Sequence, residues 1–307
     1  MRRLALLPLA LCIAPLGRAV QAQRPVSAAA APQTVESVRA RLLARIAQVP
    51  GADVAIAVRD LGSDRTLDLN GDTVFHAAST MKVPVLFALY QGFERGTLRP
   101  SQTIRLENRF RSIVDQSPYQ LDPGEDSDST VYRRVGTEVP VRELAERMIT
   151  HSSNLATNAL IALLDPEKIT TLTRDLGTTR MVVRRGVEDD VAYRAGLNNT
   201  TTANDLVALF VALQLGRVAK ADGTRDMLAI LEAQAFNDEI PAGLPGGTRM
   251  AHKTGSITAT LHDAGLVFPP GRAPFAIAIL TRNIPDQKVA AALMADCARI
   301  IWGWLVP

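Results

Sequence analysis

Apolar residues follow a helical period in some stretches of the chain and a strand period in others. Over residues 38–46 they lie four apart, which predicts a helix that ends at the Pro-Gly pair 50–51. Over 54–58 they alternate with smaller residues, which predicts a half-buried strand, and 66–69 has the composition of a short partner strand. The first structured part of the chain is therefore expected to be a helix followed by two strands.

The centre of the chain has the pattern of helices. Residues 140–148 and 155–163 carry apolar residues at helical spacing, and the Asp-Pro pair 165–166 matches the N-cap and first position of another helix. A capping box opens a further helix over 202–216. By contrast, residues 107–136 are rich in Arg, Asp, Ser and Pro, which predicts a long surface excursion.

The end of the chain returns to strands. Residues 247–254, 262–268 and 275–282 have strand composition, the turn 269–271 joins the last two, and a helix is expected over 286–304. This order predicts an α/β (α+β) fold class. An antiparallel sheet formed from both chain ends would be flanked by helices, with an all-helical domain inserted between its two parts.

The same order sets the expected domains. Residues 34–75 and 236–307 would form the α/β domain and residues 76–235 the helical domain, with an active site in the cleft between them. Residues 23–33 are small, polar and flanked by proline, which predicts a flexible leader ahead of the first domain.

The first residues have the composition of an export signal. Arginines at 2–3 precede an apolar stretch over 4–16, and small residues follow at 20–22. This pattern predicts a signal peptide over 1–22, too short for a membrane span, and hence a periplasmic or secreted protein without a membrane anchor after cleavage. A retained anchor is the alternative, and two prolines inside the apolar stretch weigh against it.

Removal of the signal changes the charge balance. The 307-residue chain has a formal net charge of +3, and residues 1–22 contain three arginines and no acid, so the remaining chain is close to neutral. The composition therefore gives no argument for nucleic acid as a partner. Cys297 is the only cysteine beyond residue 22, so the mature chain cannot form an internal disulfide.

Three short motifs carry candidate chemistry: Ser79-Thr80-Met81-Lys82, Ser152-Ser153-Asn154 and Lys253-Thr254-Gly255. With average residue usage, the S-x-x-K or S-x-N pattern is expected about once by chance in a chain of this length. K-T-G is expected in only about one such chain in ten. The set gains weight because the motifs fall at a helix start, in a loop between helices and on a strand.

The first motif has a geometry suited to nucleophilic catalysis. Pro84 fits only in the first turn of a helix, so a helix should begin near Ser79 and place its hydroxyl at the positive end of the helix dipole. Lys82 then shares a face with Ser79 and comes within reach of its oxygen. A lysine can act as the base for a serine if burial or a second cation lowers its pKa, and Lys253 is a candidate for that cation.

In this order the motifs resemble those of the class A serine β-lactamases. The resemblance extends over about residues 35–303 and includes the sequences flanking the motifs, over 75–83, 141–152 and 200–202. It implies a β-lactamase/transpeptidase-like fold. It also implies a hydrolase that opens the amide bond of β-lactam rings through an acyl-enzyme on Ser79, with no cofactor.

The resemblance assigns catalytic roles to four residues. Ser79 would attack the ring carbonyl while Lys82, or a water held by Glu188, takes its proton. Ser152 would relay a proton to the leaving nitrogen, and Glu188 would direct deacylation.

Five residues are expected to bind substrate. Asn154 would hydrogen-bond the amide of the substrate side chain, and Lys253 and Thr254 would hold its carboxylate. Gly255 would let the strand edge approach the ligand, and the backbone N–H groups of Ser256 and of the nucleophile would form an oxyanion hole.

The sequence departs from the family pattern at several positions. Ser153 stands where the second motif usually has aspartate, and Asn199 also replaces a usual aspartate. The loop that should carry the deacylating glutamate is shorter, and Ala192 stands four residues beyond Glu188, where asparagine is usual. Glu188 is the best match for the base, with the acids at 189–190 as alternatives.

Other chemistries find less support. His76, His151 and His252 flank the motifs, but His252 should point to the opposite face of its strand from Lys253, and no zinc-binding spacing occurs, so no metal is expected. No G-x-S-x-G elbow surrounds a serine, which argues against a Ser-His-Asp hydrolase.

The main hypothesis is a monomeric enzyme whose partner is a small-molecule β-lactam. Two related functions are alternatives to it. A D-alanyl-D-alanine peptidase shares the three motifs. A penicillin-binding sensor or acyl trap would react once and stay acylated.

Overall fold

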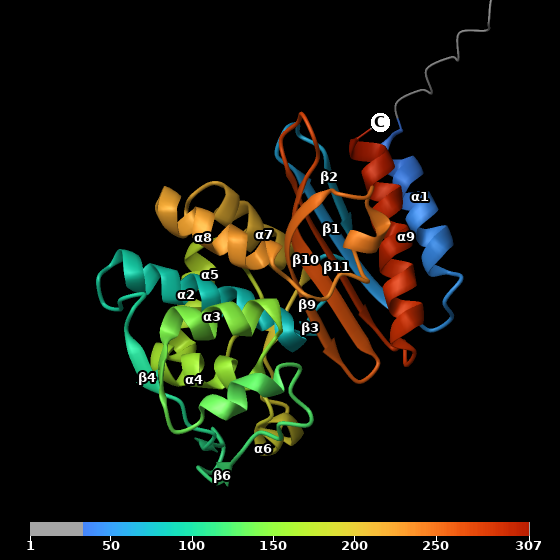
Figure 1. Ribbon diagram of the computed structural model, residues 1–307. Coiled ribbons are helices and arrows are strands. Elements are labelled where there is room, and N and C mark those ends of the chain that lie inside the picture. Colours follow the sequence, from blue (N-terminus) through green and yellow to red (C-terminus); the bar gives the residue numbers. More distant parts are fainter. Residues whose placement is uncertain (1–32, 307) are drawn as a thin grey trace, which may run out of the picture. The chain divides into compact units, whose positions relative to one another are not determined.

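This computed structural model describes residues 33–306 of the chain. Its central element is a five-stranded antiparallel sheet (Figure 1). Its strand order is β2-β1-β11-β10-β9, so strands from both chain ends meet in one sheet and the predicted α/β fold is confirmed. The strands are β1 (Asp53–Asp60), β2 (Thr66–Leu69), β9 (Arg249–Ile257), β10 (Thr260–Phe268) and β11 (Phe275–Arg282).

The predicted signal peptide over 1–22 and nearly all of the leader over 23–33 lie outside the described residues.

The strand β9 continues to Ile257, three residues past its predicted end. A two-residue turn with Ala259 at φ 53° then starts β10. The sequence has no Gly, Pro or Asn at this turn, so the turn between β9 and β10 is not recognisable from the sequence and the predicted end of β9 falls short of the observed one.

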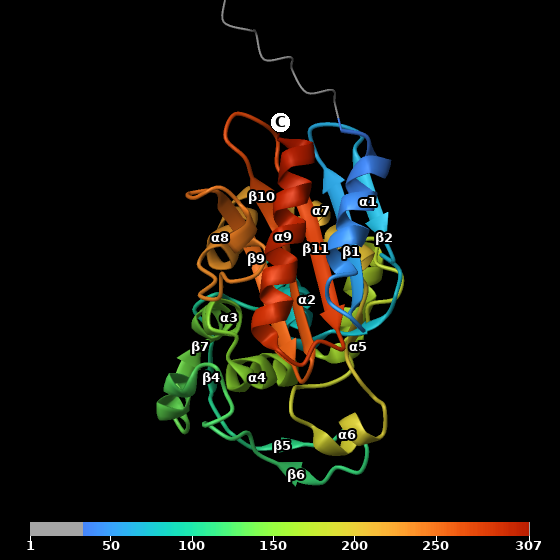
Figure 2. The same cartoon turned by 90° about the vertical axis from the view of Figure 1, so that its right-hand side faces the viewer.

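The two faces of the sheet carry different side chains. In β1, Ala55 and Ala57 face the core under the central helices, whereas Val54, Ile56 and Val58 face the helices from the chain ends. The terminal helices α1 (Val35–Ile46) and α9 (Gln287–Leu305) cover the second face (Figure 2). Small residues on the first face let α7 (Ala203–Gln214) lie close to β1, β10 and β11.

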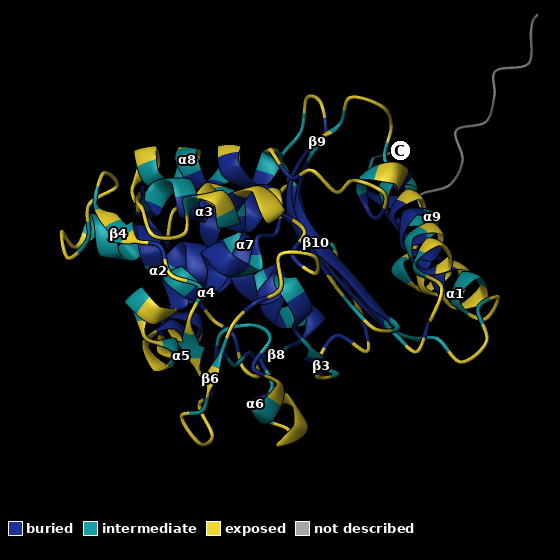
Figure 3. Ribbon diagram, turned by 60° about the horizontal axis from the view of Figure 1, so that its bottom comes forward, coloured by how far each residue is buried: buried dark blue, intermediate teal, exposed yellow. Residues whose placement is uncertain are grey.

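The central helices form a layer beyond α7 and include α2 (Lys82–Glu94), which is buried over most of its length (Figure 3). Around it lie α3 (Val141–Thr150), α4 (Asn154–Leu164), α5 (Pro166–Asp175) and α8 (Ala221–Glu232), whereas α6 (Asp190–Arg194) lies farther away. The sequence pattern did not indicate α6 or α8. Across residues 33–306, none of the helices is both long and apolar enough to cross a membrane.

The helix caps agree with the sequence in part. Asp165 caps α5 by accepting a hydrogen bond from the Glu167 N–H at 3.0 Å, and Thr202 caps α7 by accepting from the Asp205 N–H at 3.0 Å. The reciprocal bond of the expected capping box is replaced, because the Asp205 carboxylate accepts from the N–H groups of Thr179 and Arg180 at 2.7 and 2.9 Å.

The stretch 107–136 is more structured than the predicted surface excursion. It contains buried residues such as Asp126 and Val131, and its short strands pair locally. The short elements are β3 (Phe75–His76) with β8 (Thr200–Thr201), β4 (Thr103–Arg105) with β7 (Glu138–Pro140), β5 (Phe110–Arg111) with β6 (Pro118–Tyr119), and the 3-10 helices η1 (Ala78–Met81), η2 (Ser129–Arg134) and η3 (Pro241–Gly243).

The packing of η3 on α9 depends on a glycine, which can be tested. A Cβ at Gly243 would lie 2.0 Å from the Ala295 carbonyl oxygen, so Gly243→Ala must push the two backbones apart. We expect a loss of at least about 1–3 kcal/mol of stability, seen as a lower Tm.

Gly303 in α9 is the matched control, because a Cβ there meets nothing within 4 Å. Gly303→Ala should be neutral or stabilise by up to about 1 kcal/mol through helix propensity. A Gly243→Ala protein that melts with the wild type would contradict the packing described.

Candidate active site

Ser79 lies in η1, which leads directly into α2. The helix start predicted from Pro84 is therefore confirmed, although the first turn is 3-10 and the α-helix begins at Lys82. Ala78, just before the nucleophile, has φ 44°, a conformation that costs a residue with a side chain of order 1–3 kcal/mol. Neighbouring structure must hold this strained turn in place.

Strand β9 provides that neighbour. A Cβ at Gly255 would lie 3.0 Å from the backbone nitrogens of Ser79 and Thr80 and 3.2 Å from the Ala78 Cβ. Gly255 is predicted to let the strand edge approach the ligand. The structure adds a second reason for glycine, which is the close approach of the strand to the backbone of the nucleophile.

Two lysines meet behind Ser79, the predicted nucleophile. Lys82 and Lys253 are both completely buried, and both ammonium groups donate to the Ser152 hydroxyl, at 3.0 and 3.1 Å. Burial, followed by the charge of Lys253, holds the pKa of Lys82 well below its usual value. Burial also lowers the pKa of Lys253, to about 7, against the opposing effect of Asp263.

Asn154 connects this pair to the predicted deacylating base. Its Oδ1 accepts from the Lys82 ammonium at 2.8 Å, and its Nδ2 donates to Glu188 Oε1 at 2.7 Å. Lys82 also donates to the Ser152 carbonyl at 2.6 Å. In the described residues its hydrogen bonds go to Ser152 and Asn154 and not to Ser79, so the predicted direct pair is replaced by contacts around the nucleophile.

Two side-chain amides, Asn199 and Asn158, hold the loop that carries Glu188. The Asn199 side chain accepts from the N–H groups of Arg184 and Arg185 and donates to the Arg185 carbonyl at 3.0 Å, a bond that an aspartate could not make. Asn158 clamps Val187, accepting from its N–H at 2.6 Å and donating to its carbonyl at 3.0 Å.

Glu188 differs from the two acids that follow it, Asp189 and Asp190, in burial and in hydrogen-bond partners. Glu188 has φ 62° and is half-buried, and burial above all raises its pKa. Asp189 is buried and already accepts from the N–H groups of Ala192 and Ile113, at 3.0 and 2.9 Å, while Asp190 is exposed. Of these three acids, Glu188 is the one that is hydrogen-bonded to Asn154.

Two polar residues beside the site are not indicated by the sequence. Both are buried and hydrogen-bond to the backbone of the second motif or of the Glu188 loop, and they are Asp126 and Asn158. A lone acid or amide is usually solvated, whether it lies in a loop or on a helix, so the sequence does not distinguish these two residues from surface positions.

The three histidines near the motifs have separate partners. His252 points away from Lys253, as predicted, and its ring contacts Asp263 at 2.8 Å and Asn237 at 3.3 Å. The His76 ring accepts from the Ala78 N–H at 3.0 Å. His151 contacts the Thr150 hydroxyl at 2.8 Å.

Two cavities meet at the nucleophile. One of about 770 Å³ is lined by Ser152, Thr254 and Gly255, and the other, of about 340 Å³, by Asn154 and Glu188. Ser79 and Ser256 line both. The structure thus brings the predicted site residues together, with both lysines buried behind the surface of the cavities.

The arrangement agrees with comparisons to known proteins. The model of the β-lactamase enzyme family matches residues 37–305. β-Lactamase AST-1 of Nocardia asteroides is 32% identical over 273 residues, which cover 87% of this chain and 84% of that protein.

Solved structures share the fold. A β-lactamase from Xanthomonas campestris is 25% identical with a TM-score of 0.77, covering 89% of this chain and 99% of that one. PBP-A is 23% identical with a TM-score of 0.76, covering 89% and 97%. The β-lactamase/transpeptidase-like fold implied by the motifs is confirmed, and the chain belongs to the β-lactamase enzyme family.

Proposed function

We propose that this protein is a serine β-lactamase that hydrolyses the amide bond of β-lactams through an acyl-enzyme on Ser79. The observation that carries the proposal is the hydrogen-bonded path from Lys82 through Asn154 to Glu188. It supplies a base for acylation and a carboxylate for deacylation in one connected site. The 32% identity to a β-lactamase over most of the chain gives independent support.

Acylation follows from the pKa of Lys82. Because that pKa is well below its usual value, a neutral amine is available to accept the Ser79 proton, or a water held by Glu188 accepts it. The Ser79 oxygen then attacks the ring carbonyl, and the ring C–N bond breaks. The Ser152 hydroxyl, 3.0 Å from the Lys82 nitrogen, donates its proton to the leaving nitrogen and is reprotonated from Lys82.

Substrate binding uses the edge of β9. Lys253 and Thr254 hold the substrate carboxylate, and Asn154 binds the amide of its side chain. The backbone N–H groups of Ser79 and Ser256 stabilise the developing oxyanion, and such a donor is typically worth about 10²-fold or more in rate.

Deacylation needs a different base. Ser152 lines the larger cavity and Glu188 the smaller, while Ser79 lies where the two meet. Water can therefore reach the ester beside Glu188, on the side away from Ser152. This separation favours a hydrolase over an acyl trap or a peptidase.

The setting of the enzyme completes the proposal. The signal pattern over 1–22 supports export to the periplasm or the medium, where β-lactams are met. We propose a monomer without a membrane anchor. The site residues are proposed to lie between an α/β domain over 34–75 and 236–307 and a helical domain over 76–235.

The nucleophile can be tested first. Ser79→Ala should abolish acylation with the fold intact, because the ester is proposed to form on the Ser79 hydroxyl. Mass spectrometry after exposure to a penicillin should show an adduct on the wild type alone, with circular dichroism as the control for folding. An adduct on the variant would remove Ser79 from this role.

Lys253 gives a prediction about pH. Its ammonium is lost as the pH rises through about 7, so kcat/KM for carboxylate-bearing substrates should fall on the alkaline side of that value. Lys253→Ala should lower kcat/KM by about 30- to 1000-fold, the equivalent of about 2–4 kcal/mol.

Lys253→Arg is the matched variant for the same experiment. Arginine stays charged throughout the pH range of the assay, so a folded Lys253→Arg enzyme should lose the alkaline decline even if its rate is reduced. An unchanged alkaline limb in that variant would assign the decline to another group.

The role of Glu188 can be tested by measuring acylation and deacylation separately. Glu188→Gln should slow deacylation by about 10²–10⁴-fold and acylation far less, so stopped-flow assays should show a burst of one equivalent followed by a stable acyl-enzyme. In the wild type, deacylation should slow as the pH falls through the raised pKa of Glu188, because the base becomes protonated.

Asp190→Asn is the control, because Asp190 is an exposed acid lining the same cavity. It should turn over like the wild type. Wild-type turnover by Glu188→Gln would instead shift the role to Asp189 or Asp190. A wild-type protein that stops after one equivalent would be an acyl trap or a peptidase.

A further inference from the structure

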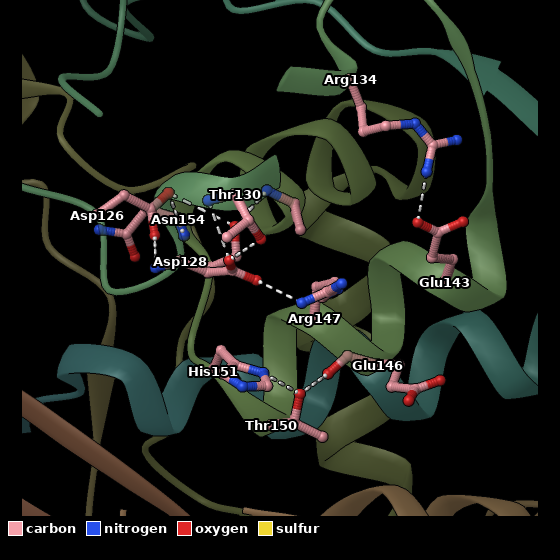
Figure 4. A network of polar contacts seen from close by, with 12 residues as sticks. Asp126, Asp128, Thr130, Arg134, Glu143, Glu146, Arg147, Thr150, His151 and Asn154 are labelled. Carbon is pink, nitrogen blue, oxygen red and sulfur yellow. Dashed lines mark hydrogen bonds and ion pairs between the residues drawn. The ribbon is translucent and has the colours of Figure 1, made fainter. Parts of the chain in front are cut away.

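Asp126 belongs to the stretch predicted as a surface excursion, yet only 7% of it is exposed and its side chain points to the start of α4 (Figure 4). Its Oδ2 accepts from the backbone N–H groups of Asn154 and Leu155, each at 2.9 Å, and from the Tyr132 hydroxyl at 3.1 Å. Its Oδ1 accepts from the Asp128 N–H at 3.0 Å. The carboxylate therefore ties the excursion to the second motif.

These hydrogen bonds complete the first turn of α4. The first N–H groups of a helix have no partner within the helix. Asp126 satisfies those of Asn154 and Leu155, and the Ser153 hydroxyl accepts from the Ala156 N–H at 3.2 Å. A negative charge is also stabilised at this end by the helix dipole.

The turn that Asp126 fixes carries catalytic groups. Asn154 is its first residue and joins Lys82 to Glu188 through bonds of 2.8 and 2.7 Å. Ser152 lies two residues earlier with φ 58°, and both lysine ammonium groups reach its hydroxyl. A shift of the helix start would change the distance from Lys82 to each of these partners.

We infer that Asp126 is a positioning residue for acylation and deacylation, acting through the backbone of Asn154. The family's second motif usually has an aspartate where this chain has Ser153, and here the carboxylate at the helix start comes from a distant segment instead. This inference rests on the proposed function, because the geometry that Asp126 holds is that of the proposed bases.

The charge of Asp126 gives the role a signature. Lys82 is faced by Lys253 from β9, by Glu188 from its loop and by Asp126. Glu188 is faced by Lys82, Asp126 and Asp190. The negative charge of Asp126 raises the pKa of Lys82 and of Glu188, so its removal should lower both.

The experiment measures acylation by a fluorescent penicillin in single turnover, between about pH 5 and pH 9, on the full chain. Asp126→Asn should acylate about 10- to 100-fold more slowly, because small displacements of reacting groups are costly. The acid limb of its pH–rate profile should also move to lower pH, since both candidate bases would then lose their protons at lower pH.

Asp128→Asn is the matched control. Asp128 is a buried acid of the same segment, but its carboxylate accepts from the Thr130 N–H and the Arg147 guanidinium, at 3.2 and 3.4 Å. It should acylate at nearly the wild-type rate with an unmoved acid limb. Wild-type acylation by Asp126→Asn, or slower acylation with an unmoved acid limb, would overturn the inference.

A second variant keeps the test decisive if Asp126→Asn does not fold. Asp126→Asn combined with Ser153→Asp returns a carboxylate to the same helix start and should acylate within about tenfold of the wild type. A folded double variant that fails to acylate would overturn the inference. Steady-state hydrolysis of a chromogenic cephalosporin by the wild type tests the proposed function separately. It measures turnover, whereas the experiment on Asp126 measures only the acylation step.

Discussion

The site depends on two buried lysines that share one hydroxyl. Removing two ammonium groups from water and placing them around Ser152 costs several kcal/mol for each charge unless protons are lost or opposite charges lie close. The protein does both. Burial and the charge of Lys253 lower the pKa of Lys82, as its proposed role as a base requires, while Asp263 and Glu239 oppose the lowering at Lys253. One lysine thus suits proton transfer and the other suits binding a carboxylate.

This pair requires close contact between elements far apart in the sequence. Lys82 begins α2 and Lys253 lies on the outer strand β9, so helix and strand must approach to within the length of two side chains. Gly255 allows β9 to pass the nucleophile turn, and the alanines of β1 allow α7 to lie against the sheet. Small residues at these contacts are therefore as necessary to the chemistry as the polar residues they bring together.

The sequence predicted the parts that follow from periodicity and from residue chemistry. Strand β11 has the predicted bounds, residues 275–282, and Pro84 indicates the start of the helix that follows Ser79. It could not predict positions set by tertiary contact. Positive φ at Ala78, Ser152 and Glu188 is maintained by surrounding bonds and leaves no local mark.

The departures from the family pattern have the same explanation. A helix start needs an acceptor for its free N–H groups, and the physics does not specify which segment supplies it. Asp126 supplies it from outside the motif, and Asn199 closes the Glu188 loop with an amide that both donates and accepts. A missing aspartate at position 153 therefore does not indicate a missing carboxylate. The start of α4 requires a negative charge and hydrogen-bond acceptors for its free N–H groups. An aspartate within the motif is one way to supply them, and a carboxylate from another segment is a second.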